Sequence, residues 1–447
     1  MAMRVLLVLM LCILASGGVY AASGSVLMDS SSLARLADAE PGAAIEVDAF
    51  PAGPGITTAI TFKRFEIYAP GARIFVVDAQ GKHEIPRSSR IHLSGYSKDG
   101  STRLGLSFDA DSSAPPYGAG SGPNGAFELH SERIGNGWRL RAISAEESLP
   151  AGVKAKFEAN EDSLPNPYAD SGMLDHLLVE QAPLGTLRNA VVAVDTDTSF
   201  MTKRFAGNTT SATAWIADLI AQMNVMYQRD LDVNLLQGTT FLRTASDPYA
   251  NTDSPASSAM LNEFGNYWSA NYSSGGNAVD RAFAMLLSGN SSSGNSASGI
   301  AWVNYYCRTS GNGGSYSTNQ IFTNSQIPVS LSASLVGHEL GHNFGAAHTH
   351  CTNTTTGLFP TGSNTIDQCS TAGSGCYSGT TSCPSSGPGA PRGTVMSYCN
   401  TFNSGACGQN VQIFHPTHIT ALRVRIAANT PSCLSLGNDT IFANGFD

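Results

Sequence analysis

The chain contains 447 residues, of which 42% are hydrophobic and 13% are charged. This composition excludes an intrinsically disordered chain, which combines little hydrophobic content with much charge, and it excludes a long coiled coil. The net charge of −9 argues against nucleic-acid and anionic-membrane partners, because both select basic surfaces. At roughly 150 residues a domain, the length predicts two or three domains.

The first 22 residues have the pattern of a secretory signal peptide. Arg4 supplies the positive charge, residues 5–14 form an apolar run, and Val19 and Ala21 fit the −3 and −1 positions of a cleavage site. The alternative, a membrane anchor, needs about 20 apolar residues, and this run has half that length. We therefore expect a secreted, extracellular protein without a membrane anchor, in a compartment where disulfides persist.

Charge and cysteine divide the remaining chain into two parts. Residues 1–185 hold 15 Lys+Arg and 21 Asp+Glu, whereas the longer stretch 186–447 holds only 10 and 13. Cysteine has the opposite distribution, because residues 23–306 contain none and eight follow. Two differently built domains explain this better than one. We predict a first domain over residues 23–185, a second over 186–433 and a C-terminal tail over 434–447.

The first domain reads as β-rich. Its short runs with alternating hydrophobicity are separated by clusters of Gly, Pro, Asp and Ser, which is the pattern of strands joined by turns. The runs cover residues 60–69, 72–77, 90–93, 103–108, 126–130 and 138–143. No group of chemically active side chains is apparent in this domain.

The second domain reads as an α/β arrangement with a mostly parallel sheet, because predicted strands alternate with predicted helices. Strands are expected over residues 189–194, 233–242 and 300–306. Helices are expected from a cap at Thr210 or Ser211 to Tyr227, across 278–287 and across 416–428. The Gly/Ser tracts 273–276, 288–299 and 310–317 are expected to be surface loops.

Residues 338–348 read HELGHNFGAAH. On a helix, His338 and His342 lie on one face and can hold one ion, and Glu339 lies close enough to reach a water on that ion. Gly345 allows the chain to turn out of the helix and bring His348 round as a third ligand. Three imidazoles that leave one position open predict a catalytic Zn²⁺ site, whereas a structural site would be closed. The alternative is a helix whose histidines are ordinary core residues.

This spacing resembles that of the metzincin metalloproteases, and a second motif strengthens the resemblance. Gly393-Thr-Val-Met396-Ser-Tyr398-Cys399 is similar to the Met-turn of that family, in which Met396 would form a hydrophobic floor beneath the ligands without binding metal. Within the metzincins, the adamalysin/reprolysin group is most similar. Thr349 departs from it, since reprolysins usually carry an acid there. Tyr398 matches a zinc-reaching tyrosine of astacins and serralysins, or it packs against the Met-turn.

The chemistry of such a site predicts peptide hydrolysis. Zinc lowers the pKa of a bound water and polarises the substrate carbonyl. Glu339 would act as the general base and then as the proton donor to the leaving nitrogen, with Tyr398 as a second candidate catalytic residue. The resemblance implies polypeptide substrates, bound extended along an edge strand. Two other functions stay open: an extracellular binding protein with a structural metal site, and a zinc amidohydrolase acting on non-peptide amides.

An even number of late cysteines predicts four disulfides, against the alternative of a second zinc site. The cysteines are Cys307, Cys351, Cys369, Cys376, Cys383, Cys399, Cys407 and Cys433. The resemblance implies that Cys307 pairs with Cys433 and leaves the other pairs unassigned. The cysteines surround the zinc motif in a region poor in apolar residues, so we expect a disulfide-rich lower part there.

A secreted protease requires latency, so the first domain is expected to be a propeptide that inhibits the enzyme. Inhibition through a cysteine thiolate is excluded, because residues 23–306 contain no cysteine. The alternative for this domain is a retained binding module. His350 is expected to be a loop residue. Asp195 and Asp197, at the end of a predicted strand, could bind calcium, and the alternative is that they are solvated strand-end carboxylates.

Overall fold

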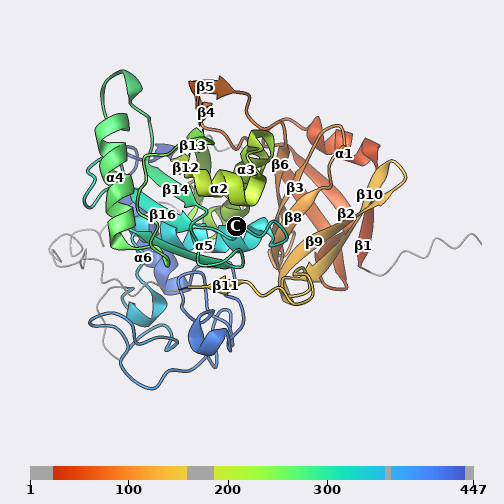
Figure 1. Ribbon diagram of the computed structural model, residues 1–447. Helices are drawn as coiled ribbons and strands as arrows, with labels where there is room; N and C mark the ends of the chain where they lie inside the picture. The colour runs from red at the N-terminus through yellow and green to blue at the C-terminus, as the bar shows by residue number, and fades with distance from the viewer. Residues whose placement is uncertain (1–23, 159–185, 358–363, 438–447) are drawn as a thin grey trace, which may run out of the picture.

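The computed structural model describes residues 24–158, 186–357 and 364–437. The expected signal peptide, most of the expected domain boundary and the end of the C-terminal tail lie outside these residues. Two sheets lie side by side, and a region of loops lies below the second sheet (Figure 1). No helix among the described residues is long and apolar enough to cross a membrane.

The N-terminal region forms an antiparallel sheet of eight strands in the order β1-β10-β9-β8-β7-β6-β3-β2. Its core contains Phe50, Phe62, Phe108 and Phe127, and helix α1 (Ser30–Ala37) covers this core with Leu33 and Leu36. The expectation of a β-rich region is confirmed. The strands are β1 (Ser25–Met28), β2 (Ala44–Gly53), β3 (Ile56–Arg64), β6 (Ile91–Ser97), β7 (Arg103–Phe108), β8 (Tyr117–Gly122), β9 (Gly125–Ile134) and β10 (Gly137–Ser144).

The second sheet is mixed, with the order β11-β15-β16-β14-β12-β13-β4-β5. Parallel pairs join β12 to β13 and β14, β14 to β16, β13 to β4 and β15 to β11. Antiparallel pairs join β15 to β16, β4 to β5 and β12 to β17. The strands are β4 (Ile74–Asp78), β5 (Gly81–Ile85), β11 (Lys156–Phe157), β12 (Arg188–Thr196), β13 (Val233–Arg243), β14 (Phe283–Ser288), β15 (Ser296–Ala301), β16 (Tyr316–Gln320) and β17 (Ser435–Leu436).

Helices cover both faces of this sheet (Figure 1). Successive side chains of a strand point to opposite faces, so Met285 and Leu287 of β14 pack with helices α3 (Thr209–Leu231) and α5 (Val329–Asn343). Ala284 and Leu286 pack instead with helix α4 (Ser258–Tyr272). Helix α2 (Thr198–Phe205) lies beside α3, and α6 (Pro416–Ala428) adds Leu422 and Ile426 to the core of the α3 face.

Several expectations for this region are wrong in detail. The helix expected over residues 278–287 does not form, and its apolar half is the buried strand β14. A continuous buried run fits a buried strand as well as a buried helix, so periodicity could not separate them. Helix α4 was not predicted. Strand β15 ends at Ala301 and begins inside an expected loop, and Asn208, not Thr210 or Ser211, caps α3.

Three strands of the N-terminal region belong to the second sheet. The hairpin β4–β5 extends it beyond β13, and β11 extends it beyond β15 at the opposite edge. Helix α3 also lies against the N-terminal sheet, where Asp218 contacts Arg90 (Oδ1 to Nε, 3.1 Å) and His92 (Oδ1 to Nε2, 3.2 Å). The two regions therefore share a sheet and a buried polar interface.

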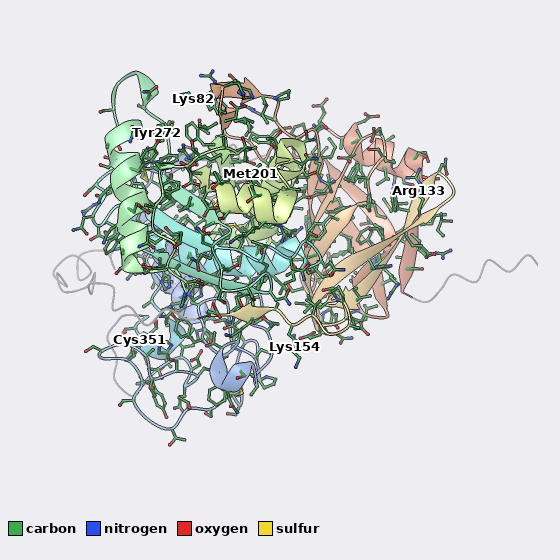
Figure 2. The ribbon with its side chains drawn as sticks, in the orientation of Figure 1. Lys82, Arg133, Lys154, Met201, Tyr272 and Cys351 are labelled. Atoms are coloured by element: carbon green, nitrogen blue, oxygen red, sulfur yellow. A yellow bond between two sulfur atoms is a disulfide. The ribbon has the colours of Figure 1, made fainter. Side chains whose placement is uncertain are left out.

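All eight late cysteines are paired in four disulfides. Cys307 pairs with Cys433, as the resemblance implied, and ties the end of the strand region to the segment after α6. The other pairs, which sequence left open, are Cys351–Cys376, Cys369–Cys399 and Cys383–Cys407. They cross-link the loops below the sheet, where Figure 2 labels Cys351. The alternative of a second zinc site at these cysteines is wrong.

Candidate active site

Helix α5 carries His338 and His342 one turn apart, and the chain leaves the helix at Gly345 with φ of 105°. A side chain at Gly345 would also meet the guanidinium of Arg425. This turn brings His348 back to the helix. Nε2 of His342 then lies 3.1 Å from Nε2 of His338 and 3.1 Å from Nε2 of His348.

These three nitrogens fit one metal ion. Two nitrogens bound tetrahedrally at about 2.05 Å from zinc would lie about 3.3 Å apart, close to the observed separations. The Nδ1–H of His338 donates to the carbonyl of Val395, and that of His342 donates to the carbonyl of Ala346, both at 2.7 Å. Because Nδ1 carries the proton in both rings, the lone pair on Nε2 of His338 and of His342 is left to bind a metal.

Burial favours the neutral, metal-binding form of the three imidazoles. It lowers the pKa of His338 to about 4 and, with the neighbouring His338, the pKa of His342 to about 3. Burial and the other two rings also hold the pKa of His348 well below its usual value. A neutral ring is the form that coordinates zinc, so these histidines need lose no proton near neutral pH.

Glu339 follows the first of these histidines and is buried beside strand β15. A methyl group at Gly299 would lie 2.4 Å from Cγ of Glu339, so only glycine at this position leaves room for the carboxylate. Burial raises the pKa of Glu339 to about 8. A cation held by the histidines would lower that pKa again, because it stabilises the carboxylate.

Met396 and Tyr398 both lie close to the histidine cluster. Met396 is fully buried, and its Sδ lies where a side chain at Gly341 of α5 would stand. The ring of Tyr398 lies 4.2 Å from the ring of His348, centroid to centroid. A cleft is lined by residues of α5, β15 and the Met396 segment, among them His338, Glu339 and Tyr398.

Asp367 is a site residue that sequence reasoning missed. Its side chain is 7% exposed, and Oδ2 accepts hydrogen bonds from Thr349 Oγ1 and, at 2.6 Å, from Ser397 Oγ. Thr349 directly follows His348, and Ser397 directly follows Met396. The carboxylate therefore joins the third histidine's segment to the methionine's segment. No motif surrounds Asp367, so only the fold brings it there.

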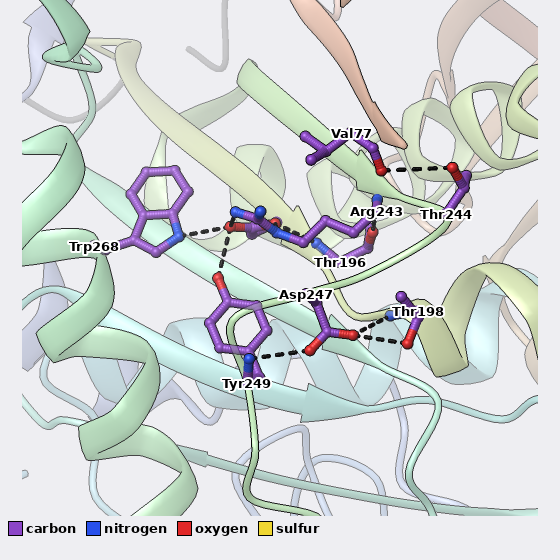
Figure 3. A network of polar contacts seen from close by, with 9 residues as sticks. Val77, Thr196, Thr198, Arg243, Thr244, Asp247, Tyr249 and Trp268 are labelled. Carbon is purple, nitrogen blue, oxygen red and sulfur yellow. Dashed lines mark hydrogen bonds and ion pairs between the residues drawn. The ribbon is translucent and has the colours of Figure 1, made fainter. Parts of the chain in front are cut away.

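Neither interpretation of Asp195 and Asp197 fits the structure, because both carboxylates are buried and hydrogen-bonded to protein donors, so they are not solvated and present no free oxygens for calcium. Asp195 pairs with Arg243 through two bonds of 2.7 Å and accepts from Tyr249 and Trp268, and Figure 3 shows these three side chains converging. Asp197 caps helix α2 and accepts further bonds from residues 288–290. Donors already occupy both carboxylates, so neither is available to a cation.

His350 was expected to be a loop residue, and the structure places it instead in a single turn of 3₁₀ helix (Thr349–Cys351). It is buried, with its ring stacked on that of His348 at 5.4 Å. Nε2 of His350 lies 3.0 Å from the carbonyl oxygen of Ala372. The ring thus supports His348 from the side facing the disulfide-rich loops.

Residues 186–423 match a family model, Reprolysin_5, described as metallo-peptidase family M12. The match covers more than half of the chain. The protein belongs to metallo-peptidase family M12. As an M12 metallopeptidase it is a peptidase of a zinc-dependent class, and the histidine cluster lies within the matched residues.

Other comparisons add little to this M12 assignment. Comparison with curated proteins finds no match. Metalloproteinase-II from Bacteroides fragilis aligns at 12% identity and a TM-score of 0.33, over 65% of this chain and 78% of that one. A structure of a chaperone-substrate complex aligns at 12% identity and a TM-score of 0.26, over 54% of this chain and 36% of that one. Structural similarity at these TM-scores supports no conclusion about fold or function.

Proposed function

We propose that this M12 metallopeptidase is a secreted zinc endopeptidase. His338, His342 and His348 would hold the zinc ion, and Glu339 would be the general base. The observation that carries the proposal is the convergence of three Nε2 atoms, with separations of 3.1 Å, beside a buried carboxylate on the same helix. A structural site would need no such carboxylate, which argues against a binding protein that merely retains a metal.

Each side chain has a role that its surroundings support. Bound zinc would polarise the scissile carbonyl and acidify the attacking water. Glu339 takes the proton of that water on a carboxylate oxygen and passes it to the leaving amide nitrogen. Tyr398, whose ring lies against His348, donates a hydrogen bond to the oxygen that becomes negative. Met396 packs under α5 and keeps the helix and the third histidine in register.

The same residues support a metzincin of the adamalysin/reprolysin group. In that group the methionine turn underlies the zinc ligands, and here Met396 lies against Gly341 of the ligand-bearing helix. Thr349, which stands where that group usually carries an acid, is bonded to the carboxylate of Asp367. Asp367, from another loop, thus supplies a carboxylate next to position 349.

The domain plan that we propose is a signal peptide over residues 1–22, an inhibitory propeptide over 23–185, a protease domain over 186–433 and a tail over 434–447. The surface of α3 under the N-terminal sheet is polar, with Asp218 and Gln222 facing it. Both amide atoms of the Gln222 side chain are buried without a partner, so water could satisfy them after release of the propeptide. Four disulfides support an extracellular location.

Sequencing the N-terminus of the secreted protein tests this plan. A mature chain that starts near residue 186 supports a removable propeptide. A chain that starts near Ala22 would instead favour the alternative, a retained binding module.

Digestion of casein, with and without a zinc chelator, tests the function itself. We expect the processed protein to cleave casein, to lose this activity with the chelator and to regain it with added zinc. Cleavage of small amides but not of casein would favour the alternative, a zinc amidohydrolase. Stable zinc binding without any hydrolysis would favour the binding protein.

A further inference from the structure

Residues 149–158 form a strap that runs from the N-terminal sheet to the edge of the second sheet (Figure 1). Its strand β11 pairs in parallel with β15, and the N–H groups of Lys156 and Glu158 donate to the carbonyls of Asn295 and Ala297, both at 2.8 Å. The other edge of β15 is paired with β16. The strap therefore lies on the edge of β15 that a further strand would need.

Phe157 anchors the strap in an apolar pocket. Its side chain is 9% exposed, and its ring packs edge-on against that of Phe322 at 5.3 Å between centroids. Leu331 and Leu335 of helix α5 form another wall of the pocket. Leu335 lies three residues before His338, so this pocket and the three histidines share one helix. The pocket is completed by Ala297 and Ile327, and Leu149, Val153 and Ala155 of the strap cover its rim.

The anchored end of the strap reaches the catalytic cleft. Phe157 and Glu158 line that cleft together with His338, Glu339 and Tyr398. On β15, Ala297 pairs with Phe157, and Gly299 lies two residues further along, against Glu339. An extended chain bound on this edge of β15 would therefore pass directly from the Phe157 pocket to the proposed general base.

Among the described residues, few further hydrogen bonds attach the strap to the rest of the protein. Glu158 accepts hydrogen bonds from Ser292 at 2.9 and 2.8 Å, and Gln409 donates to the carbonyl of Ala155 at 3.5 Å. Lys154, labelled in Figure 2, is exposed. Phe157 is the one fully inserted side chain of the strap, whereas Leu149, Val153 and Ala155 are only partly buried, so loss of the ring should release the strap.

We propose that the strap is the inhibitory element of the N-terminal region, and that the Phe157 pocket binds a large apolar side chain of the polypeptide substrate. This inference rests on the proposed peptidase function. Strap and substrate need the same edge of β15, and a tethered segment competes at a high effective concentration. The intact chain is therefore latent, and a cut beyond the strap would allow substrate to replace it.

A binding experiment tests the pocket without relying on catalysis. The probe is a labelled synthetic peptide of residues 150–158, added to full-length chains that carry Glu339→Ala. We expect the Phe157→Ala chain to bind it at least about 30-fold more tightly than the chain that keeps Phe157, since truncation of a buried anchor commonly costs that much affinity. A peptide with Ala in place of its Phe should bind about 30-fold more weakly. Equal binding by both chains, or by both peptides, would overturn the proposal.

The inhibition is tested by an activity measurement on intact, unprocessed chains that keep Glu339. Phe157→Ala should raise the initial rate of hydrolysis of a short peptide about 10-fold or more, whereas Phe157→Leu and the exposed control Lys154→Ala should stay latent. Thermal unfolding checks that each chain folds. Lys156→Pro, which removes the N–H bonded to Asn295, releases the strap without altering the pocket and should also activate.

The two proposals fail in different ways. A Phe157→Ala chain that stays latent, while the processed protein hydrolyses the same peptide, overturns the strap as inhibitor. Absence of hydrolysis by every form, with peptide binding as expected, overturns the peptidase function and supports the pocket.

Discussion

Ser397 donates a hydrogen bond of 2.6 Å from Oγ to Oδ2 of Asp367, a buried carboxylate. The same oxygen accepts from Thr349, and the backbone N–H of Thr349 donates to the carbonyl of Met396 at 3.0 Å. These bonds connect the residue after the third histidine to the methionine segment. The position of His348 therefore depends on a residue outside both motifs.

Asp367→Asn is expected to weaken zinc retention. Both hydroxyls bond to Oδ2 of Asp367, whereas Oδ1 accepts the backbone N–H of Cys369 at 3.2 Å. An amide that keeps its oxygen toward the hydroxyls turns its NH2 group toward the N–H of Cys369, and the reverse orientation loses the hydroxyl bonds, so the segment of His348 should loosen. Loss of such a supporting bond typically costs 10–100-fold in metal affinity or activity, and we expect a loss of about 10-fold or more. Zinc release to a chromogenic chelator measures it.

The double variant Thr349→Asp with Asp367→Asn is the matched control, because it returns the acid to the position that reprolysins usually use. It should recover part of the zinc affinity. Unchanged zinc release by Asp367→Asn would show that the carboxylate does not position the site.

Tyr398→Phe separates the two roles considered for this residue. Since we propose that the hydroxyl stabilises the developing oxyanion, we expect kcat to fall about 100-fold while KM changes little. If the ring only packs against His348, phenylalanine keeps the packing and kcat stays near that of the unaltered chain. Steady-state kinetics on a peptide decides between them, with zinc content measured to confirm that the metal is retained.

The buried carboxyl of Glu128 should make the stability of the folded protein depend on pH. It is buried at the contact between the N-terminal sheet and α5, where Tyr117 donates to it at 3.1 Å and Ser330 donates to its other oxygen. Burial raises the pKa of Glu128 to about 7 from 4.5. The folded chain thus holds this proton more tightly than the unfolded chain. The stabilisation from the protonated Glu128 carboxyl is complete below pH 4.5 and is lost as the pH rises through about 7. The free energy of unfolding should fall by about 3 kcal/mol over this range.

Denaturant unfolding at pH 5 and pH 8 measures this dependence against Glu128→Gln, which cannot ionise. The free energy of unfolding of the unaltered chain should fall more over this range than that of the variant. Equal changes in the two chains would contradict the raised pKa.

Asp195→Asn is expected to destabilise the protease region by about 3–5 kcal/mol, because it leaves Arg243 buried without its counter-ion. Asp195 is fully buried and also accepts from Tyr249 at 2.6 Å and from Trp268 at 3.0 Å. The exposed Asp280→Asn is the control and should change stability by less than about 0.5 kcal/mol. Chemical unfolding measures both, and similar values for the two variants would refute the structural role.

The sequence alone could predict the parts of the site that obey short-range geometry. His338, Glu339, His342 and His348 follow from helix periodicity and one glycine turn, and the structure brings all four together. Asp367 could not be predicted, because it lies 18 positions after Thr349, within the loop closed by the Cys351–Cys376 disulfide. Contacts of this kind are set by tertiary packing.

The fold class of each region could be predicted from sequence, but the pairing of strands between the two regions could not. Strand β7 and helix α6 have the expected bounds, since their hydrophobic patterns are unambiguous. Helix α4 has Asn, Ser, Gly and Tyr at many positions, which obscures its apolar face. That β4 and β11 join the sheet of the protease region depends on long-range pairing, which strand propensity does not encode.

Zinc content and peptide hydrolysis of the Glu339→Ala chain, measured together after processing, test the central claim most directly. The account predicts about one zinc ion per chain, as in the unaltered protein, with kcat lowered by about 1,000-fold or more, because the base is lost and the ligands are kept. Hydrolysis near the unaltered rate by the zinc-loaded variant would contradict it.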